Sequence, residues 1–391
     1  MAEIAPRPYD GLRIVDLSGE LSGYVTRLFA DLGAEVILVE PPGGRPERQR
    51  EPLSGSVNYA DAAFAFLNAG KKSVVIDWRG GSGAEILADL VSSAQVVVVE
   101  ADAGALLPQI MRVPGPRVVT VVSHFGLDGP YAGYRSCDLV TQSLGGIAWL
   151  SGTPDGPPLR LPGEQTSMVT SLYAAVATAL ALWDLETHGS GHVIDVSAQE
   201  CIAHSLQNAL QVWDLERHIS SRGGEGTRDS TEDIFACRDG YVFLAAPLSL
   251  PMSWRALVEW MREEAYPGGE RLSHPDWTDR ARRATAAARA EFRTIFESFI
   301  RERTRAEMRA EALRRKIVLA PVSRISDLAD DPQLIFRRFF VDVPHPALGR
   351  SLRFPGAPYR LSEPVWHIDR AAPRAGEHDT ELSGIRRFAA R

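Results

Sequence analysis

Cysteine is scarce in this chain of 391 residues. The three cysteines, Cys137, Cys201 and Cys237, are odd in number and far apart, so they form neither a metal-binding pattern nor a disulfide framework. Such usage is typical of a reducing compartment. A secretory leader is not evident either, because residues 1–9 contain no apolar core. We therefore expect a cytoplasmic protein without a bound metal.

Long hydrophobic runs are also missing. The longest apolar stretch, Leu172–Trp183, has about 12 residues, whereas a helix that crosses a bilayer needs roughly 20. Basic residues are outnumbered, since 43 Lys and Arg stand against 50 Asp and Glu, for a net charge of −7. General nucleic-acid binding depends on a basic surface. These features predict neither a membrane nor a nucleic acid as partner.

Several common catalytic and nucleotide-binding motifs are absent as well. The chain contains no Walker A loop, no HExxH, no GxSxG and no CxxC. No GxGxxG follows an apolar run, so the glycines that would cradle a nicotinamide dinucleotide are missing. The composition is otherwise that of a globular protein, with 45% hydrophobic and 24% charged residues. We expect no bound cofactor.

The N-terminal half alternates short apolar runs with amphipathic segments. Strands are expected at residues 12–17, 35–39, 73–77, 95–100 and 117–123. Leu21–Leu32 carries apolar residues at helical spacing and ends before Gly33. Another helix is expected over Ser82–Ser93, where Ser82 and Glu85 have the spacing of a capping box. Strands joined by helices predict an α/β fold with a large Rossmann-like parallel sheet.

The second half begins a new unit after a polar segment with several glycines at 219–231. We predict a large Rossmann-like domain over 1–225, a small α/β domain over 226–325, and a C-terminal segment, 326–391, that returns to the large domain. The proline-rich part of that segment, 340–391, is expected to be irregular and to wrap a surface. Large aromatic side chains are expected in the core, among them Trp149, Trp183 and Trp213.

Several short motifs follow one another in a characteristic order. They include Leu28-Phe-Ala-Asp-Leu-Gly33, Asn68-Ala-Gly-Lys-Lys72, Phe125-Gly-Leu-Asp-Gly-Pro-Tyr131, Gly189-Ser-Gly-His-Val-Ile-Asp195 and Pro355-Gly-Ala-Pro358. No single motif is specific. The ordered set, however, resembles the family III CoA-transferases (CaiB/BaiF type) over nearly the whole chain. That family includes formyl-CoA transferases and α-methylacyl-CoA racemases.

The resemblance implies two chains interlocked as a dimer, each with a large and a small domain. It implies acyl-CoA and a carboxylic acid as substrates and CoA transfer between them as the function. The reaction would pass through an aspartyl anhydride and then an aspartyl-CoA thioester. A carboxylate is needed because it must attack a thioester carbonyl and then carry the acyl group.

The chain departs from the family at the catalytic aspartate. Counting back from Leu172-Tyr-Ala-Ala175 puts Ser167 at that position, and a serine hydroxyl cannot carry an acyl anhydride. The nearest carboxylate, Glu164, either replaces the nucleophile through a shifted loop or lies at a helix N-terminus, where the dipole favours it. Asp138 matches an acidic active-site position but could instead cap the following helix. A racemase is disfavoured, because Ser167 offers only a hydroxyl where a second base is needed.

Predicted CoA contacts also come from the resemblance. The family's segment after the first strand contributes Leu21 and Ser22 here. Lys71 and Lys72 match the family, and two ammonium groups beside a nucleotide phosphate make physical sense, although solvated loop lysines would have the same pattern. Arg135 aligns with a basic CoA-contacting position. Two other basic positions of the family are missing, which weakens CoA binding.

A mobile glycine loop covers the active site in the family's transferases. Gly223, Gly224 and Gly226 occupy its position, where glycine permits the backbone geometry of a lid, but an ordinary linker would look alike. Three functions are therefore open. The chain is a CoA-transferase, or a non-catalytic acyl-CoA-binding subunit beside an Asp-bearing homologue, or an enzyme with another reaction on acyl-CoA. We expect a homodimer or a heterodimer with a family member.

Overall fold

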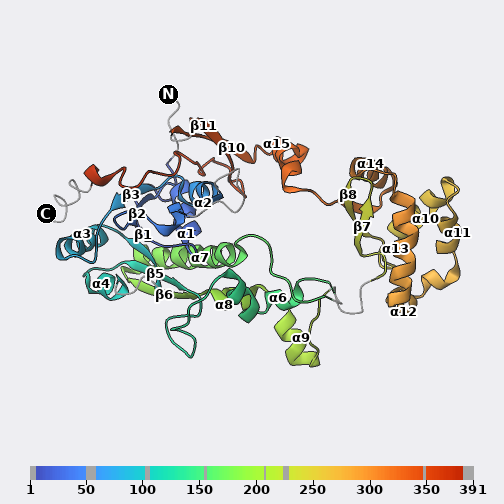
Figure 1. Ribbon diagram of the computed structural model, residues 1–391, viewed down its shortest axis with the longest axis horizontal. Helices are drawn as coiled ribbons and strands as arrows, with labels where there is room; N and C mark the ends of the chain where they lie inside the picture. Colours follow the sequence, from blue (N-terminus) through green and yellow to red (C-terminus); the bar gives the residue numbers. More distant parts are fainter. Residues whose placement is uncertain are drawn as a thin grey trace. The chain divides into compact units, whose positions relative to one another are not determined.

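The computed structural model describes residues 6–49, 59–101, 106–153, 156–206, 208–222, 229–346 and 349–381. The chain divides into two compact units, and each is described by itself (Figure 1). Unit 1 consists of residues 1–219 and 335–391, and unit 2 consists of residues 220–334. The chain therefore leaves unit 1, builds unit 2 and then returns to unit 1.

Unit 1 is built on a six-stranded sheet with the order β3-β2-β1-β4-β5-β6. All neighbouring strands pair in parallel, which requires a crossover between successive strands. The predicted α/β class with a parallel sheet is confirmed. The strands are β1 (Arg13–Leu17), β2 (Glu35–Glu40), β3 (Lys72–Val75), β4 (Val96–Glu100), β5 (Val118–Ser123) and β6 (His192–Ser197).

Helices cover both faces of this sheet (Figure 1). Val96 and Val98 of β4 pack on one face with α1, α7 and α8, whereas Val97 and Val99 pack on the other with α3 and α4. Because both faces are buried, Val96–Val99 are apolar at every position. The helices of unit 1 are α1 (Gly23–Asp31), α2 (Tyr59–Asn68), α3 (Gly81–Ser92), α4 (Leu106–Arg112), α5 (Asp138–Leu144), α6 (Ile147–Leu150), α7 (Gln165–His188), α8 (Ala198–Ser205) and α9 (Ala209–Glu216).

The chain re-enters unit 1 through α15 (Pro332–Phe336) and an antiparallel hairpin of β10 (Phe340–His345) and β11 (Arg350–Pro355). Val343 and Phe354 of the hairpin are buried with Ala65 of α2. The expectation of irregular structure from residue 340 onward was wrong for this hairpin. Its strands form because alternate apolar side chains gain burial against α2.

Residues 376–381 lie along the edge of β3, and we call them the edge strap. The His378 N–H donates to the Ser73 carbonyl at 2.9 Å, and the Gly376 N–H donates to the Ser73 hydroxyl at 3.0 Å. The Val75 N–H donates to the Asp379 carboxylate at 2.8 Å. An unpaired strand edge is a template for unwanted pairing, so the strap protects this side of the sheet.

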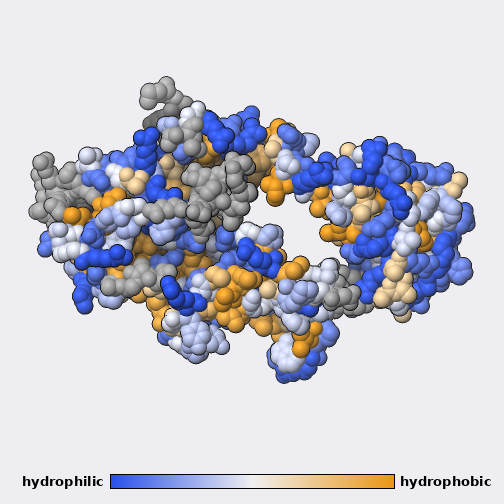
Figure 2. Space-filling model, in the orientation of Figure 1, coloured by the Kyte–Doolittle hydropathy of each residue, from blue (hydrophilic) through white to orange (hydrophobic). Residues whose placement is uncertain are grey.

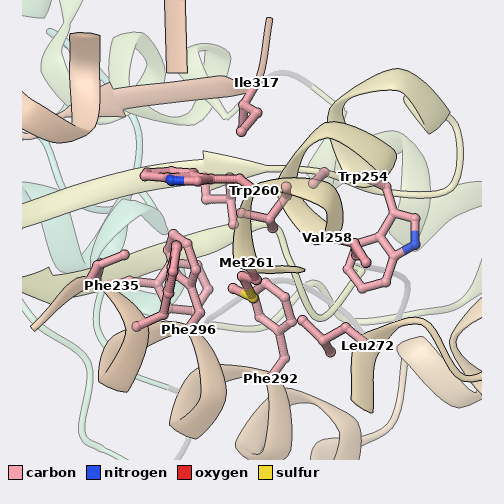
Figure 3. Close-up of a cluster of buried hydrophobic side chains, with 14 of the residues drawn as sticks. Phe235, Trp254, Val258, Trp260, Met261, Leu272, Phe292, Phe296 and Ile317 are labelled. Atoms are coloured by element: carbon pink, nitrogen blue, oxygen red, sulfur yellow. The ribbon is translucent and has the colours of Figure 1, made fainter. Parts of the chain in front are cut away.

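Unit 2 combines a small antiparallel sheet with helices around an aromatic core. Phe235 meets Phe292 and Phe296 edge to face, at ring-centroid distances of 5.6 and 4.9 Å, and Trp254 and Trp260 belong to the same buried cluster (Figure 3). Unit 2 thus has a core of its own. Its elements are β7 (Asp233–Cys237), β8 (Gly240–Ala245), β9 (Val318–Pro321), α10 (Pro251–Glu263), α11 (Pro267–Leu272), α12 (Arg280–Arg283), α13 (Ala286–Ile300) and α14 (Arg305–Arg315).

Three tryptophans that we expected in the core lie on the surface instead. Trp149, Trp183 and Trp213 are 47%, 68% and 48% exposed. Figure 2 shows hydrophobic residues gathered on the surface of unit 1 in the region of α6 and α8. The expectation was wrong because an apolar residue in a helix packs inward only if its side of the helix faces the core.

Helix α7 exposes a row of apolar side chains that we call the apolar stripe. Its members are three or four residues apart and share one side of the helix, with exposures of 51%, 60%, 67% and 68% for Leu172, Val176, Leu180 and Trp183. At 24 residues, α7 is longer than the apolar stretch noted in the sequence. The length and apolar composition of α7 would suit a helix that crosses a membrane. Core helices of soluble proteins share both properties, so these two properties alone are weak evidence for a membrane span.

Candidate functional site

A cavity of about 780 Å³ opens at the carboxyl edge of the unit 1 sheet. Residues from the ends of β1, β2, β4 and β5 meet there with the N-terminal turn of α7. In this strand order, β1 lies between β2 and β4, so the chain winds away in opposite directions from this point. Open α/β sheets bind ligands in the crevice at such a switch point. Lining residues include Leu17, Val39, Glu100, His124, Asp138 and Ser167.

The first turn of α7 places the predicted residue Ser167 in the cavity wall. Ser167 is 6% exposed, and its hydroxyl donates to the Glu20 carbonyl at 2.7 Å. Thr166, the residue before it, donates its backbone N–H to the Asp138 carboxylate at 3.1 Å. The hydroxyl of Ser167 is therefore anchored to the β1–α1 turn.

Asp138 begins α5 and also lines the cavity. Besides the Thr166 contact, its carboxylate accepts a hydrogen bond from the Gln142 side chain at 2.7 Å. Gln142 is held in turn, because its amide oxygen accepts the Leu161 N–H at 2.8 Å. Asp138 thus holds a negative charge against the N-terminus of α7, where the helix dipole stabilises it.

Glu164 occupies the N-cap position of α7 and lines the same cavity. Its side chain makes no capping hydrogen bond to the helix. The residue is exposed, unlike Ser167 three positions later. The three predicted catalytic residues, Asp138, Glu164 and Ser167, are therefore brought together around one helix end. Among them the two carboxylates differ, since that of Asp138 is held by hydrogen bonds and that of Glu164 is exposed at the rim.

The β1–α1 turn holds the predicted contacts Leu21 and Ser22. Leu21 lines the cavity, but Ser22 is fully buried. The carboxylate of Glu100 accepts the backbone N–H groups of Gly19 at 2.7 Å and Ser22 at 2.9 Å, together with the Ser22 hydroxyl at 2.8 Å. A Cβ atom on Gly19 would lie 2.6 Å from that carboxylate, so a larger residue would push the Glu100 side chain out of this position. Backbone N–H groups at the start of α1, which have no acceptor within the helix, therefore donate to a carboxylate of the same chain.

The chain matches the model of CoA-transferase family III over residues 9–379. It belongs to that family. It is similar to the succinyl-CoA:(R)-benzylsuccinate CoA-transferase subunit BbsE of Thauera aromatica, at 34% identity over 96% of this chain and 93% of the relative. It is 28% identical to a succinyl-CoA:mesaconate CoA-transferase of Haloarcula marismortui, over 95% of each chain. A crystal structure of a CAIB/BAIF family protein from Brucella suis has a TM-score of 0.86 at 25% identity, over 97% of this chain and 99% of that one.

Within this family III chain, the two predicted lysines do not line the cavity. Lys71 is completely buried, and its ammonium donates to Asp16 at 2.8 Å, to the Gly23 carbonyl at 3.0 Å and to Asn68 at 3.0 Å. Burial works to raise the pKa of Asp16, but the charges of Lys71 and Arg45 overcome it and hold that pKa well below its usual range. All three donors of Lys71 are used inside the unit, so it stabilises a buried carboxylate.

Lys72 and Arg135 also lie outside the cavity lining. The ammonium of Lys72 pairs with Glu35 at 2.8 Å and with Glu381 of the edge strap at 2.6 Å. Arg135 is exposed in the loop that follows β5. The structure therefore does not bring these predicted CoA contacts together with the catalytic candidates.

Sequence reasoning missed the arginines that do reach the cavity. Arg79, just beyond β3, and Arg160, just before α7, are exposed and line it. Arg45 lines it too, but its guanidinium donates to the Asp16 and Val39 carbonyls at 3.0 Å each. The position of Arg79 after a parallel strand was the available signal, because the carboxyl ends of such strands meet at one edge.

The predicted lid glycines, Gly223, Gly224 and Gly226, lie outside the described residues. Over the part of the chain that the structure describes, no group of three or more His, Cys, Asp or Glu side chains is arranged to hold a metal ion. Carboxylates predominate over free guanidinium groups in the cavity wall. Its acidic residues are Glu20, Glu47, Glu100, Asp138 and Glu164.

Proposed function

We propose that this chain is a subunit of a CoA-transferase that moves CoA between an acyl-CoA and a carboxylic acid. Acyl-CoA lies at the carboxyl edge of unit 1, and an Asp-bearing family member supplies the acyl-carrying carboxylate in a cytoplasmic heterodimer. The observation that carries the proposal is Ser167, whose hydroxyl is anchored to Glu20 at the position where the resemblance expects an aspartate. The subunit name of the Thauera relative supports it.

The chemistry explains why this position matters. The carrier's carboxylate attacks the thioester carbonyl, CoA leaves as its thiolate, and a mixed anhydride forms. The thiolate then attacks the carrier's carbonyl, which releases the first acid and leaves CoA on the carrier. Attack by the acceptor acid regenerates an anhydride, and CoA leaves with the new acyl group. An oxygen ester on Ser167 is much less activated than an anhydride, so CoA could not readily reclaim the acyl group.

The apolar stripe of α7 supports a tightly bound partner. Four large apolar side chains in one row are unusual on the free surface of a monomer. The stripe also offers an explanation for the exposed tryptophan of α7, because Trp183 would be buried in an interface. We therefore place a family member against this side of unit 1.

A second candidate function is a self-sufficient transferase in which Glu164 is the carrier. The exposed carboxylate of Glu164 at the cavity rim favours it. Attack requires that carboxylate to come within about 3–3.5 Å of the thioester carbonyl. Glu164 also has one methylene more than aspartate, which extends its reach.

Exchange of labelled CoA, followed by mass spectrometry, separates the two candidates. The purified chain alone should be inactive, activity should appear with the Asp-bearing partner, and Ser167→Asp should create or raise activity. Hydroxylamine should trap the acyl group on the partner. Activity of the chain alone that is lost in Glu164→Gln and kept in Ser167→Ala would establish Glu164 as the carrier. Inactivity of every combination would refute CoA transfer.

A further inference from the structure

Arg160 is a cavity arginine with most of its hydrogen-bonding capacity unused. Its Nε and Nη2 groups donate to the Leu161 and Gly163 carbonyls at 3.4 and 3.2 Å. Its Nη1 group has no hydrogen-bond partner among the described residues. The side chain is 47% exposed. A guanidinium carries five N–H donors in a planar fork, so one edge of this fork remains available.

The nearby acid does not use up this edge. Arg160 Nη2 lies 3.9 Å from an Asp138 oxygen, which is longer than a hydrogen bond. The two Asp138 oxygens already accept from Thr166 and Gln142. The charge of the Asp138 carboxylate therefore orients the Arg160 guanidinium, but it does not occupy the free N–H donors of that guanidinium.

Asp138 also links Arg160 to the first turn of α7, where the catalytic candidate Ser167 lies. One of its oxygens contacts the first turn of α7, next to Ser167, and the other faces Arg160. Arg160 thus lies on the α7 side of the cavity, whereas Arg79 follows β3 on the other side of the switch point. A ligand that spans the cavity meets the two arginines at different ends.

We infer that Arg160 selects acyl groups that carry a second carboxylate. This inference rests on the proposed function, because it takes the thioester end of the ligand to lie beside the first turn of α7. In a four-carbon dicarboxylic acyl group, the free carboxylate lies on the order of 4–5 Å from the thioester carbonyl. The open edge of a guanidinium binds a carboxylate with two parallel N–H···O bonds. An acyl group with an uncharged alkyl end would form no hydrogen bond with the guanidinium and would gain no binding energy from it.

The test compares two ligands of equal chain length, succinyl-CoA and butyryl-CoA, by calorimetry on the purified protein with any partner that copurifies. Without an acceptor acid, no new acyl-CoA forms, and any reaction stops once CoA is bound to the partner's carrier. The wild type should bind succinyl-CoA about tenfold more tightly, the size of one charge-assisted hydrogen-bonded pair. Arg160→Gln should remove that preference and leave butyryl-CoA binding unchanged, and Arg160→Lys should keep part of it.

Arg79→Gln is the matched control, since it removes a cavity arginine on the β3 side and should weaken both ligands equally. Equal binding of the two ligands by the wild type would overturn the inference. So would a preference that persists in Arg160→Gln, or an equal loss for both ligands in that variant, which would indicate that Arg160 only braces its loop. If no acyl-CoA binds at all, the proposed function itself fails, and that outcome is distinct from the others.

Discussion

At the scale of single residues, the buried pair of Lys71 and Asp16 should matter most for stability. Lys71→Met leaves the Asp16 carboxylate without its main counter-charge, which should lower the free energy of unfolding by about 3–5 kcal/mol. Urea denaturation measures this loss. Lys72→Met is the matched control, because Lys72 pairs near the surface, and it should cost less than about 1 kcal/mol.

The pH dependence of the Lys71→Met effect follows from the direction of the Asp16 shift. The pKa of Asp16 is lowered in the folded state, because its charged neighbours outweigh its burial. Its contribution to stability is therefore present above the unfolded pKa of about 4 and is lost as the pH falls below it. The difference between wild type and Lys71→Met should shrink in acid. A difference that is constant from pH 7 to pH 3 would contradict this account.

The sequence predicted some roles of single residues and could not predict others. Asp138, Glu164 and Ser167 line one cavity, as a shared site requires, although their chemical roles stay a prediction. Lys71 looked like a phosphate contact because its partner Asp16 is 55 residues away, and only the sheet brings them together. Arg160 gave no signal, since an exposed loop arginine has no pattern in sequence.

At the scale of elements, the edge strap makes a specific prediction. Asp379→Ala removes the acceptor of the Val75 N–H at the β3 edge and should lower the free energy of unfolding by about 1 kcal/mol. Hydrogen exchange of the Val75 amide should also become faster. Asp379→Asn is the control, because its amide oxygen can still accept this bond. Equal exchange rates in all three proteins would show that the strap does not protect the edge.

The parallel strands were predictable because runs such as Val96–Val99 are apolar at every position. The residues at which helices begin were less predictable. The Ser82 and Glu85 pair has capping-box spacing, yet α3 begins at Gly81 with Gly80 as its N-cap, and no side chain caps it. A capping box forms instead at Thr304 and Glu307 of α14. Spacing alone does not fix the backbone angles that a cap requires.

At the scale of the whole molecule, the apolar stripe should hold the partner. Trp183→Glu places a charge within an apolar contact and should shift the assembly toward monomers at micromolar concentration, as measured by light scattering. Met252→Glu is the control, because Met252 is equally exposed at 68% but belongs to unit 2 and not to the stripe. A wild type that is monomeric at this concentration would refute the predicted dimer.

The two-part construction of unit 1 has a consequence for synthesis on the ribosome. The last strand of its six-stranded sheet ends at Ser197, but the strap that covers β3 ends near residue 381. At about 5–20 residues per second, translation of the intervening segment takes roughly 10–40 seconds. During that interval unit 2 emerges and can fold, while the β3 edge and the α2 surface remain uncovered. Nascent chains should therefore need protection by a chaperone until translation is nearly finished.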